Sequence, residues 1–174
     1  MNYSEYGNLS RVLRHTGDMF EKHGQELIRV RDLAREISEL IESMSPFVQH
    51  NTEAVCPSCQ NVCCINLHSY HDHRDIVYLH ALGEKVPSYK KGIDDVAPCQ
   101  FLGERGCMVN RSLRPYRCTW FFCTPLLDRI RCSPVSLYRR FIDSLQLLTQ
   151  KRQDMMNLFL EISKEGFVDY SGIL

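Results

Sequence analysis

Nine cysteines, eight of them in two groups, are the feature that most constrains how this chain folds. The first group has the spacing C-x2-C-x3-C-C, and the second has the spacing C-x7-C-x10-C-x4-C. In order, the eight are Cys56, Cys59, Cys63, Cys64, Cys99, Cys107, Cys118 and Cys123. Two residues between the first pair let one turn aim both sulfurs at one point, which is typical of a metal knuckle. We therefore predict that these eight cysteines are metal ligands, which suffice for one centre or for two tetrahedral sites or clusters.

The start of the chain and its hydropathy predict the compartment. The first ten residues, MNYSEYGNLS, lack the basic start and apolar run of a secretory signal peptide. No stretch approaches the roughly 18 apolar residues that a membrane span needs. We expect a cytoplasmic protein with no membrane contact, where clustered thiols bind metal more often than they form disulfides. Cys132 stands apart from both groups, and we interpret it as a small buried apolar side chain.

Helical periodicity flanks the cysteine-rich centre on both sides. One apolar stripe predicts a helix from about residue 25 to 45 that Pro46 ends. A longer helix is predicted from about 134 to 164, because Ser133 and Pro134 form a typical helix start. Its stripe is interrupted at Arg152. The first stripe comprises Val30, Leu33, Ile37, Leu40 and Met44, and the second Leu137, Phe141, Leu145, Leu148, Met155, Phe159 and Ile162.

The centre shows little regular structure. A short helix is expected from Asp72 to Leu82, with Gly83 as its C-cap. Two short apolar runs around the segment from Gly103 to Gly106 predict a small hairpin. The length of 174 residues predicts one domain, 1–174, with a cysteine-rich core at 54–125. We thus expect a mainly α protein whose long helices pack around a loop-rich metal centre, with at most a small β-hairpin.

Charge is distributed unevenly along a chain whose formal net charge is zero. Residues 100–140 carry eight arginines and two acidic residues, a net charge of +6. Arg111, Arg114 and Arg117 recur every three residues beside aromatic side chains. Such a pattern can bind single-stranded nucleic acid, but it can also balance thiolate charge while the aromatic rings cover the metal. We predict the second role, close to the metal ligands, and we expect no nucleic-acid partner.

The adjacent pair Cys63-Cys64 bears on the kind of metal. Neighbouring side chains diverge, so both bind more easily to different metal atoms than to one isolated ion. This favours a [4Fe–4S] cluster over Zn²⁺ as the cofactor, with zinc kept as the alternative. The closely spaced His68, His71 and His73 offer further ligands, but we interpret them as the polar, exposed start of a helix.

The second half of the cysteine-rich core resembles a known family. Cys99-Gln-Phe-Leu, Cys107-Met-Val, Arg114-Pro115, Cys118 and Cys123 resemble the motifs of the YkgJ-type cysteine-cluster family. The resemblance spans about residues 54–125 and implies chelation of zinc or iron by eight cysteines. The flagellin lysine N-methylases, which look like distant relatives, share the cysteine core.

These features together predict a metal-binding protein with an electron-transfer or redox role, and more readily a binding module than an enzyme. Two alternatives stay open. The resemblance to flagellin lysine N-methylases implies protein methylation from S-adenosylmethionine, although the sequence has no G-x-G turn typical of nucleotide-like cofactors. The other is a zinc-stapled interaction domain that uses its apolar helical stripes to bind a protein partner.

Overall fold

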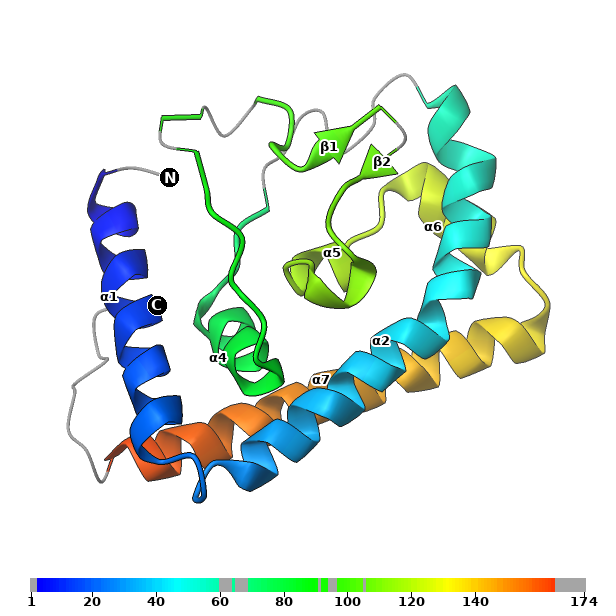
Figure 1. The fold of residues 1–174 in the computed structure, drawn as a ribbon. Helices are drawn as coiled ribbons and strands as arrows, with labels where there is room; N and C mark the ends of the chain where they lie inside the picture. The colour runs from blue at the N-terminus through cyan, green and yellow to red at the C-terminus, as the bar shows by residue number, and fades with distance from the viewer. Residues whose placement is uncertain are drawn as a thin grey trace.

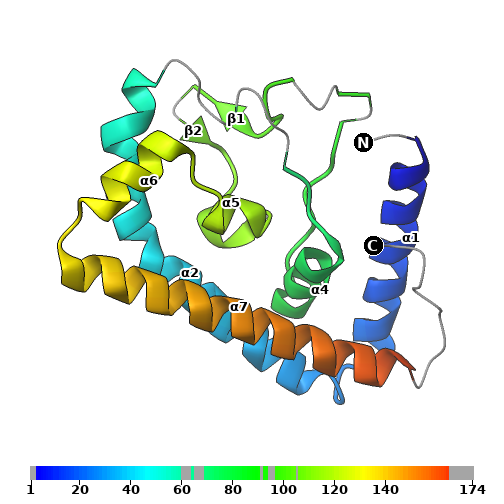
Figure 2. The same ribbon diagram turned by 180° about the vertical axis from the view of Figure 1, so that it is seen from behind.

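Two long helices form a platform on which the rest of the molecule lies. The computed structural model describes residues 3–59, 64, 69–90, 92–93, 97–104 and 106–164. Helices α2 (Ile28–Val55) and α7 (Val135–Lys164) pack against each other. They run side by side in opposite directions along one edge of the molecule (Figures 1 and 2). The prediction of a mainly α fold with two long packed helices is confirmed.

Helix α2 continues through Pro46 to Val55, so the prediction that Pro46 ends it is wrong. A proline inside a helix removes one backbone hydrogen bond and usually bends the helix, and α2 bends along its course in Figure 1. Buried residues on both sides of the proline, Met44 and Val48, hold the two halves in one helix. The extension matters because it brings Cys56 to the end of a firmly packed helix.

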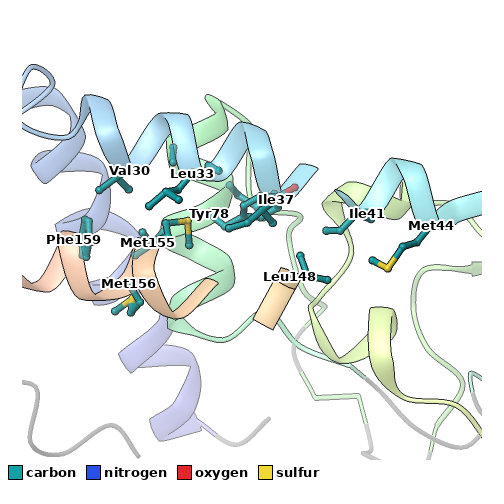
Figure 3. Packing of buried hydrophobic residues seen from close by; sticks show 14 of the residues in the cluster. Val30, Leu33, Ile37, Ile41, Met44, Tyr78, Leu148, Met155, Met156 and Phe159 are labelled. Carbon is teal, nitrogen blue, oxygen red and sulfur yellow. The ribbon is translucent and has the colours of Figure 1, made fainter. Parts of the chain in front are cut away.

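The apolar stripes of α2 and α7 meet in the core (Figure 3). Helix α7 starts at Val135, one residue after the predicted start, and its stripe buries Phe141, Leu148, Met155 and Phe159. Leu137 was expected in this stripe, but 43% of it is exposed. From α2, Val30, Leu33, Ile37 and Met44 of the predicted stripe are buried, but Leu40 is only partly buried and Ile41 is buried in its place.

Two further helices close one end of the platform. Helix α4 (His73–Leu82) contacts both long helices, and α1 (Tyr3–Lys22) packs on α4. Asp72 caps α4 by accepting from the N–H of Asp75, and Gly83 ends it with a φ of 76°, as predicted. Among residues 9–22 of α1, the buried positions are Val12, Thr16, Met19 and Phe20, which share one face at helical spacing.

The cysteine-rich centre lies at the other end (Figure 1). Strands β1 (Leu102–Gly103) and β2 (Gly106–Cys107) form the predicted antiparallel hairpin, in which Leu102 pairs with Cys107. Two short helices that the sequence did not reveal follow: α5 (Arg117–Trp120) and α6 (Thr124–Arg131). Within the described part of the chain, none of the helices combines the length and apolar character needed to cross a bilayer.

Leu148 and Leu147 test whether the buried stripe of α7 supports the fold. Leu148 is fully buried, whereas 46% of its neighbour Leu147 is exposed. We expect Leu148→Ala to lower the free energy of unfolding by about 2–5 kcal/mol, because the substitution leaves a cavity. Leu147→Ala, the matched control, should change it by less than about 0.5 kcal/mol. Chemical denaturation measures both, and equal losses would contradict the packing described.

Candidate metal centre

Seven of the eight predicted ligands line one cavity, although they come from two separate groups in the sequence. The wall of this cavity carries Cys56, Cys59, Cys64, Cys99, Cys107, Cys118 and Cys123. Each is partly buried, and none of the described cysteines forms a disulfide. The eighth predicted ligand, Cys63, lies outside the described residues. The fold thus brings both cysteine groups to one place.

The ends of structural elements position most of these cysteines. Cys56 starts the short helix η1 (Cys56–Ser58) directly after α2, Cys107 ends β2, Cys118 lies in α5, and Cys123 immediately precedes α6. The N–H of Cys99 donates to the carbonyl oxygen of Cys64 at 2.7 Å. This backbone hydrogen bond joins the first cysteine group directly to the second.

The cavity offers more space than a single ion occupies. Its volume is about 170 Å³, whereas a cavity that holds one water needs only about 10–15 Å³. Apolar side chains, among them Val48, Phe101 and Phe122, complete the wall. Among the residues that the structure describes, no group of three or more Cys, His, Asp or Glu side chains is arranged to hold a metal ion. The structure thus shows that the thiols share a cavity. That they bind a metal there is a proposal.

Arginine side chains face the same space. Arg114 and Arg117 line the cavity, while Arg111 is not among its lining residues. Arg114 Nε donates to the carbonyl oxygen of Val109 at 2.8 Å, which fixes the guanidinium beside the thiols. Burial lowers the pKa of Arg111, and negative charge at Cys107 opposes that shift. Positive charge is thus within electrostatic reach of the cysteines, although only two of the three predicted arginines lie on the wall.

The electrostatics of the thiols fit a bound cation. Burial raises the pKa of the Cys118 thiol, a hydrogen bond with Ser69 lowers it, negative charge at Cys107 and Cys99 raises it, and the charge of Arg114 lowers it. The net shift favours the neutral thiol. Because the thiolate is the metal-binding form of cysteine, a bound cation would shift this balance towards the thiolate. The donor set fits either an iron–sulfur cluster or zinc.

A buried ion pair supports the second cysteine group. Asp75 of α4 and Arg152 of α7 expose only 4% and 5% of their side chains, and 2.9 Å separates Asp75 Oδ1 from Arg152 Nη2. The N–H of Tyr116, two residues before Cys118, lies 3.2 Å from each Asp75 oxygen and donates to the carboxylate. The Arg152 guanidinium also lies 4.0 Å from the centre of the Tyr116 ring. Arg152, which interrupts the apolar stripe of α7, therefore connects α7 to α4 and to the segment that carries Cys118.

A second buried polar contact holds the same segment. His71 Nε2 donates to the carbonyl oxygen of Leu113 at 3.0 Å, so Nδ1 is the acceptor of a hydrogen bond from the Tyr89 hydroxyl. That hydroxyl in turn accepts from the His71 N–H at 2.9 Å. Burial lowers the pKa of His71 and raises that of Tyr89. A neutral imidazole is therefore built into the support of residues 111–118.

Two expectations about exposure are wrong. His71 was expected on the surface, but it is 4% exposed because the Tyr89 hydroxyl and the Leu113 carbonyl satisfy both ring nitrogens. Cys132 was expected to be buried, but it is exposed at the end of α6. The buried face of α6 contains Leu126 and Ile130, and Cys132 falls outside that spacing. His68 lies outside the described residues.

Comparison with models of protein families, with curated proteins and with solved structures gives no match for this chain. The resemblance to the YkgJ-type cysteine-cluster family therefore depends on the cysteine and Arg-Pro motifs alone.

Removing Arg152 should strongly destabilise the protein at pH 7.5. We expect Arg152→Met to lower the free energy of unfolding by about 3–5 kcal/mol, because it leaves the Asp75 carboxylate buried without its partner. The double variant Arg152→Met/Asp75→Asn should recover part of the loss, and the exposed Arg139→Met is the control. Urea denaturation measures the free energy of unfolding of the parent and of the three variants. A double variant no more stable than Arg152→Met would contradict the pairing.

The buried His71 should make stability depend on pH. Unfolded His71 takes up a proton below its ordinary pKa of about 6.5, whereas the lowered pKa keeps the folded imidazole neutral. The unfolded state then binds more protons, so stability falls as the pH decreases from 7.5 to 5.5. The stability advantage of the parent over His71→Gln should therefore shrink across this range. A difference that stays constant or grows as the pH decreases would exclude this role for His71.

Proposed function

We propose that this chain is a metal-binding protein that holds an iron–sulfur cluster between its two cysteine groups. The observation that carries the proposal is the single cavity lined by seven cysteines and two arginines. The backbone hydrogen bond between Cys99 and Cys64 supports it, because it keeps the two groups side by side. The resemblance of the cysteine motifs to the YkgJ-type family supports the same conclusion.

The size of the cavity favours a cluster over a single zinc ion. A structural zinc site closes around the ion with Zn–S distances of about 2.3 Å, whereas this cavity has a volume of about 170 Å³. When bound, a [4Fe–4S] cluster supplies a centre that accepts or releases one electron. Arg114 and Arg117 would offset the negative charge of the ligated cluster, and hydrogen bonds to sulfur tune its potential. We therefore propose an electron-transfer role.

Zinc is the second candidate, and one local feature favours it. The N–H of Cys59 donates to the carbonyl oxygen of Cys56 at 3.2 Å, so these two cysteines share the tight turn of a metal knuckle. With zinc, the centre would be a structural staple without redox chemistry. The identity of the bound metal therefore distinguishes the two proposed functions, an electron carrier and an interaction domain.

Purification without oxygen tests the proposal directly. We expect brown protein with about four irons and four acid-labile sulfides per chain, and an absorbance band that dithionite bleaches. Colourless protein that contains zinc and no sulfide would overturn the cluster and support the staple. Binding of S-adenosylmethionine in calorimetry would instead favour methyl transfer.

Two cysteine variants test the ligand set. We expect Cys118→Ser to lose most of its iron, because Cys118 lines the cavity. Cys132→Ser should keep the iron, because Cys132 follows Cys123 by nine residues along α6, about 13 Å at 1.5 Å per residue. Elemental analysis of the folded variants, checked by circular dichroism, gives the metal content. Equal losses in the two variants would show that the ligand set is wrong.

A further inference from the structure

Positive charge is concentrated in one segment of this neutral chain. Residues 106–142 contain seven arginines and one acidic residue, Asp128, a net charge of +6, so the remainder carries −6. This segment forms β2, α5, α6 and the start of α7, which lie together at one end of the molecule (Figures 1 and 2). Such a separation steers a negatively charged partner towards that end.

An aromatic patch lies on the surface within this basic end. The single tryptophan of the chain, Trp120, is 48% exposed, and Phe121 is 37% exposed. Their ring centres lie 6.3 Å apart, and the Arg117 guanidinium lies 5.3 Å from the centre of the Phe121 ring. Tryptophan and arginine are the residue types that most often carry binding energy in protein interfaces. We call Arg117, Trp120 and Phe121 the aromatic patch.

Two of the three residues of the aromatic patch also line the cysteine cavity. Arg117 and Phe121 line the cavity and are also exposed to solvent. Trp120 lies in the chain between Cys118 and Cys123, which both line the cavity. A partner seated on the patch would therefore contact side chains that also line the cavity of the thiols.

We infer that the aromatic patch is the docking surface for an acidic protein that carries a one-electron cofactor. The inference rests on the proposed cluster and names its partner. One electron passes from the reduced cofactor of the partner to the cluster, with no bond formed or broken and no proton transferred. Electron-transfer complexes are small and weak, and opposite charges speed their formation. A compact aromatic patch within a basic end fits this kind of partner.

The contacts of the patch favour a protein over a nucleic acid. Single strands bind through bases stacked on open aromatic faces and through arginines that reach phosphates. Here Arg117 lies over the Phe121 ring, and Trp120 meets Phe121 edge-on at 74°. Arg131 pairs with Asp128 at 3.3 Å. Contacts within the protein thus already cover part of the aromatic faces and guanidinium groups that a single strand would need.

Fluorine NMR tests docking without depending on electron transfer. A chain labelled with 5-fluorotryptophan gives one resonance, which comes from Trp120. We expect oxidised flavodoxin, an acidic one-electron carrier, to shift this resonance at low salt and to lose the effect at high salt. A single-stranded oligonucleotide is the second probe. A shift with the oligonucleotide and none with flavodoxin would overturn the inference in favour of nucleic acid.

Stopped-flow reduction of the cluster by reduced flavodoxin tests the same surface by function. We expect Arg117→Glu and Trp120→Ala each to slow reduction by flavodoxin at low salt by at least about tenfold relative to reduction of the same variant by dithionite, because Arg117→Glu also changes the charge beside the cluster. The matched controls are the exposed Arg29→Glu and Ile28→Ala at the start of α2, which should leave the rate unchanged. The rate for the parent should fall as salt increases.

The outcomes separate this inference from the proposed function. A chain that contains no cluster refutes the proposed function, whatever flavodoxin does to the Trp120 resonance. A chain with a cluster that dithionite reduces, but with equal flavodoxin rates for Arg117→Glu and Arg29→Glu, refutes the docking surface alone. The cluster absorbance and the thermal unfolding of each variant check that it is folded and contains the cluster before its rate is compared with that of the parent.

Discussion

The buried contact between Asp75 and Arg152 is the interaction on which the arrangement of the candidate centre depends. Asp75 accepts a hydrogen bond from the Tyr116 N–H and forms an ion pair with the Arg152 guanidinium. These contacts join α4, α7 and the segment that carries Cys118. A buried ion pair is often no more stabilising than a well-packed apolar pair, because both charges lose their hydration. Its contribution here is orientation, since it requires one relative placement of three separate segments. Together with the contact from His71 to Leu113, it fixes residues 113–118 beside the helical platform.

The sequence predicted the features that follow from periodicity and local turn chemistry. Apolar stripes at helical spacing located α7 and most of α2, and Asp72 and Gly83 marked the ends of α4. Two glycines located the hairpin. The spacing of the cysteines predicted two groups, and the structure places seven of the eight around one cavity. The helices and the hairpin are predicted because each depends on residues close together in the chain, whereas the meeting of the two cysteine groups depends on the tertiary fold.

Other features depend on contacts between distant segments, which local patterns do not reveal. Pro46 was expected to end a helix, but burial of Met44 and Val48 on either side of it outweighs the lost hydrogen bond. Arg152 looked like a break in an apolar stripe, because its partner Asp75 is far away in the sequence. His71 looked exposed for the same reason, since Tyr89 and Leu113 make its burial favourable. The apolar stripe of α1 is weak in the sequence, and its residues are buried through contact with α4.

The distribution of buried residues suggests why a metal would matter to this fold. The four longest described helices bury extensive apolar stripes, whereas the segment from Cys99 to Cys123 buries few side chains, among them Ser112, Pro115 and Thr119. Segments with so little buried apolar surface gain little from the hydrophobic effect, and metal binding can supply folding free energy in its place. The polar contacts of Asp75 and His71 then attach this segment to the helical frame, whose own core is apolar. Such a division would let the ligands, and the aromatic patch that lies in the same segment, respond to the metal while the platform keeps its position.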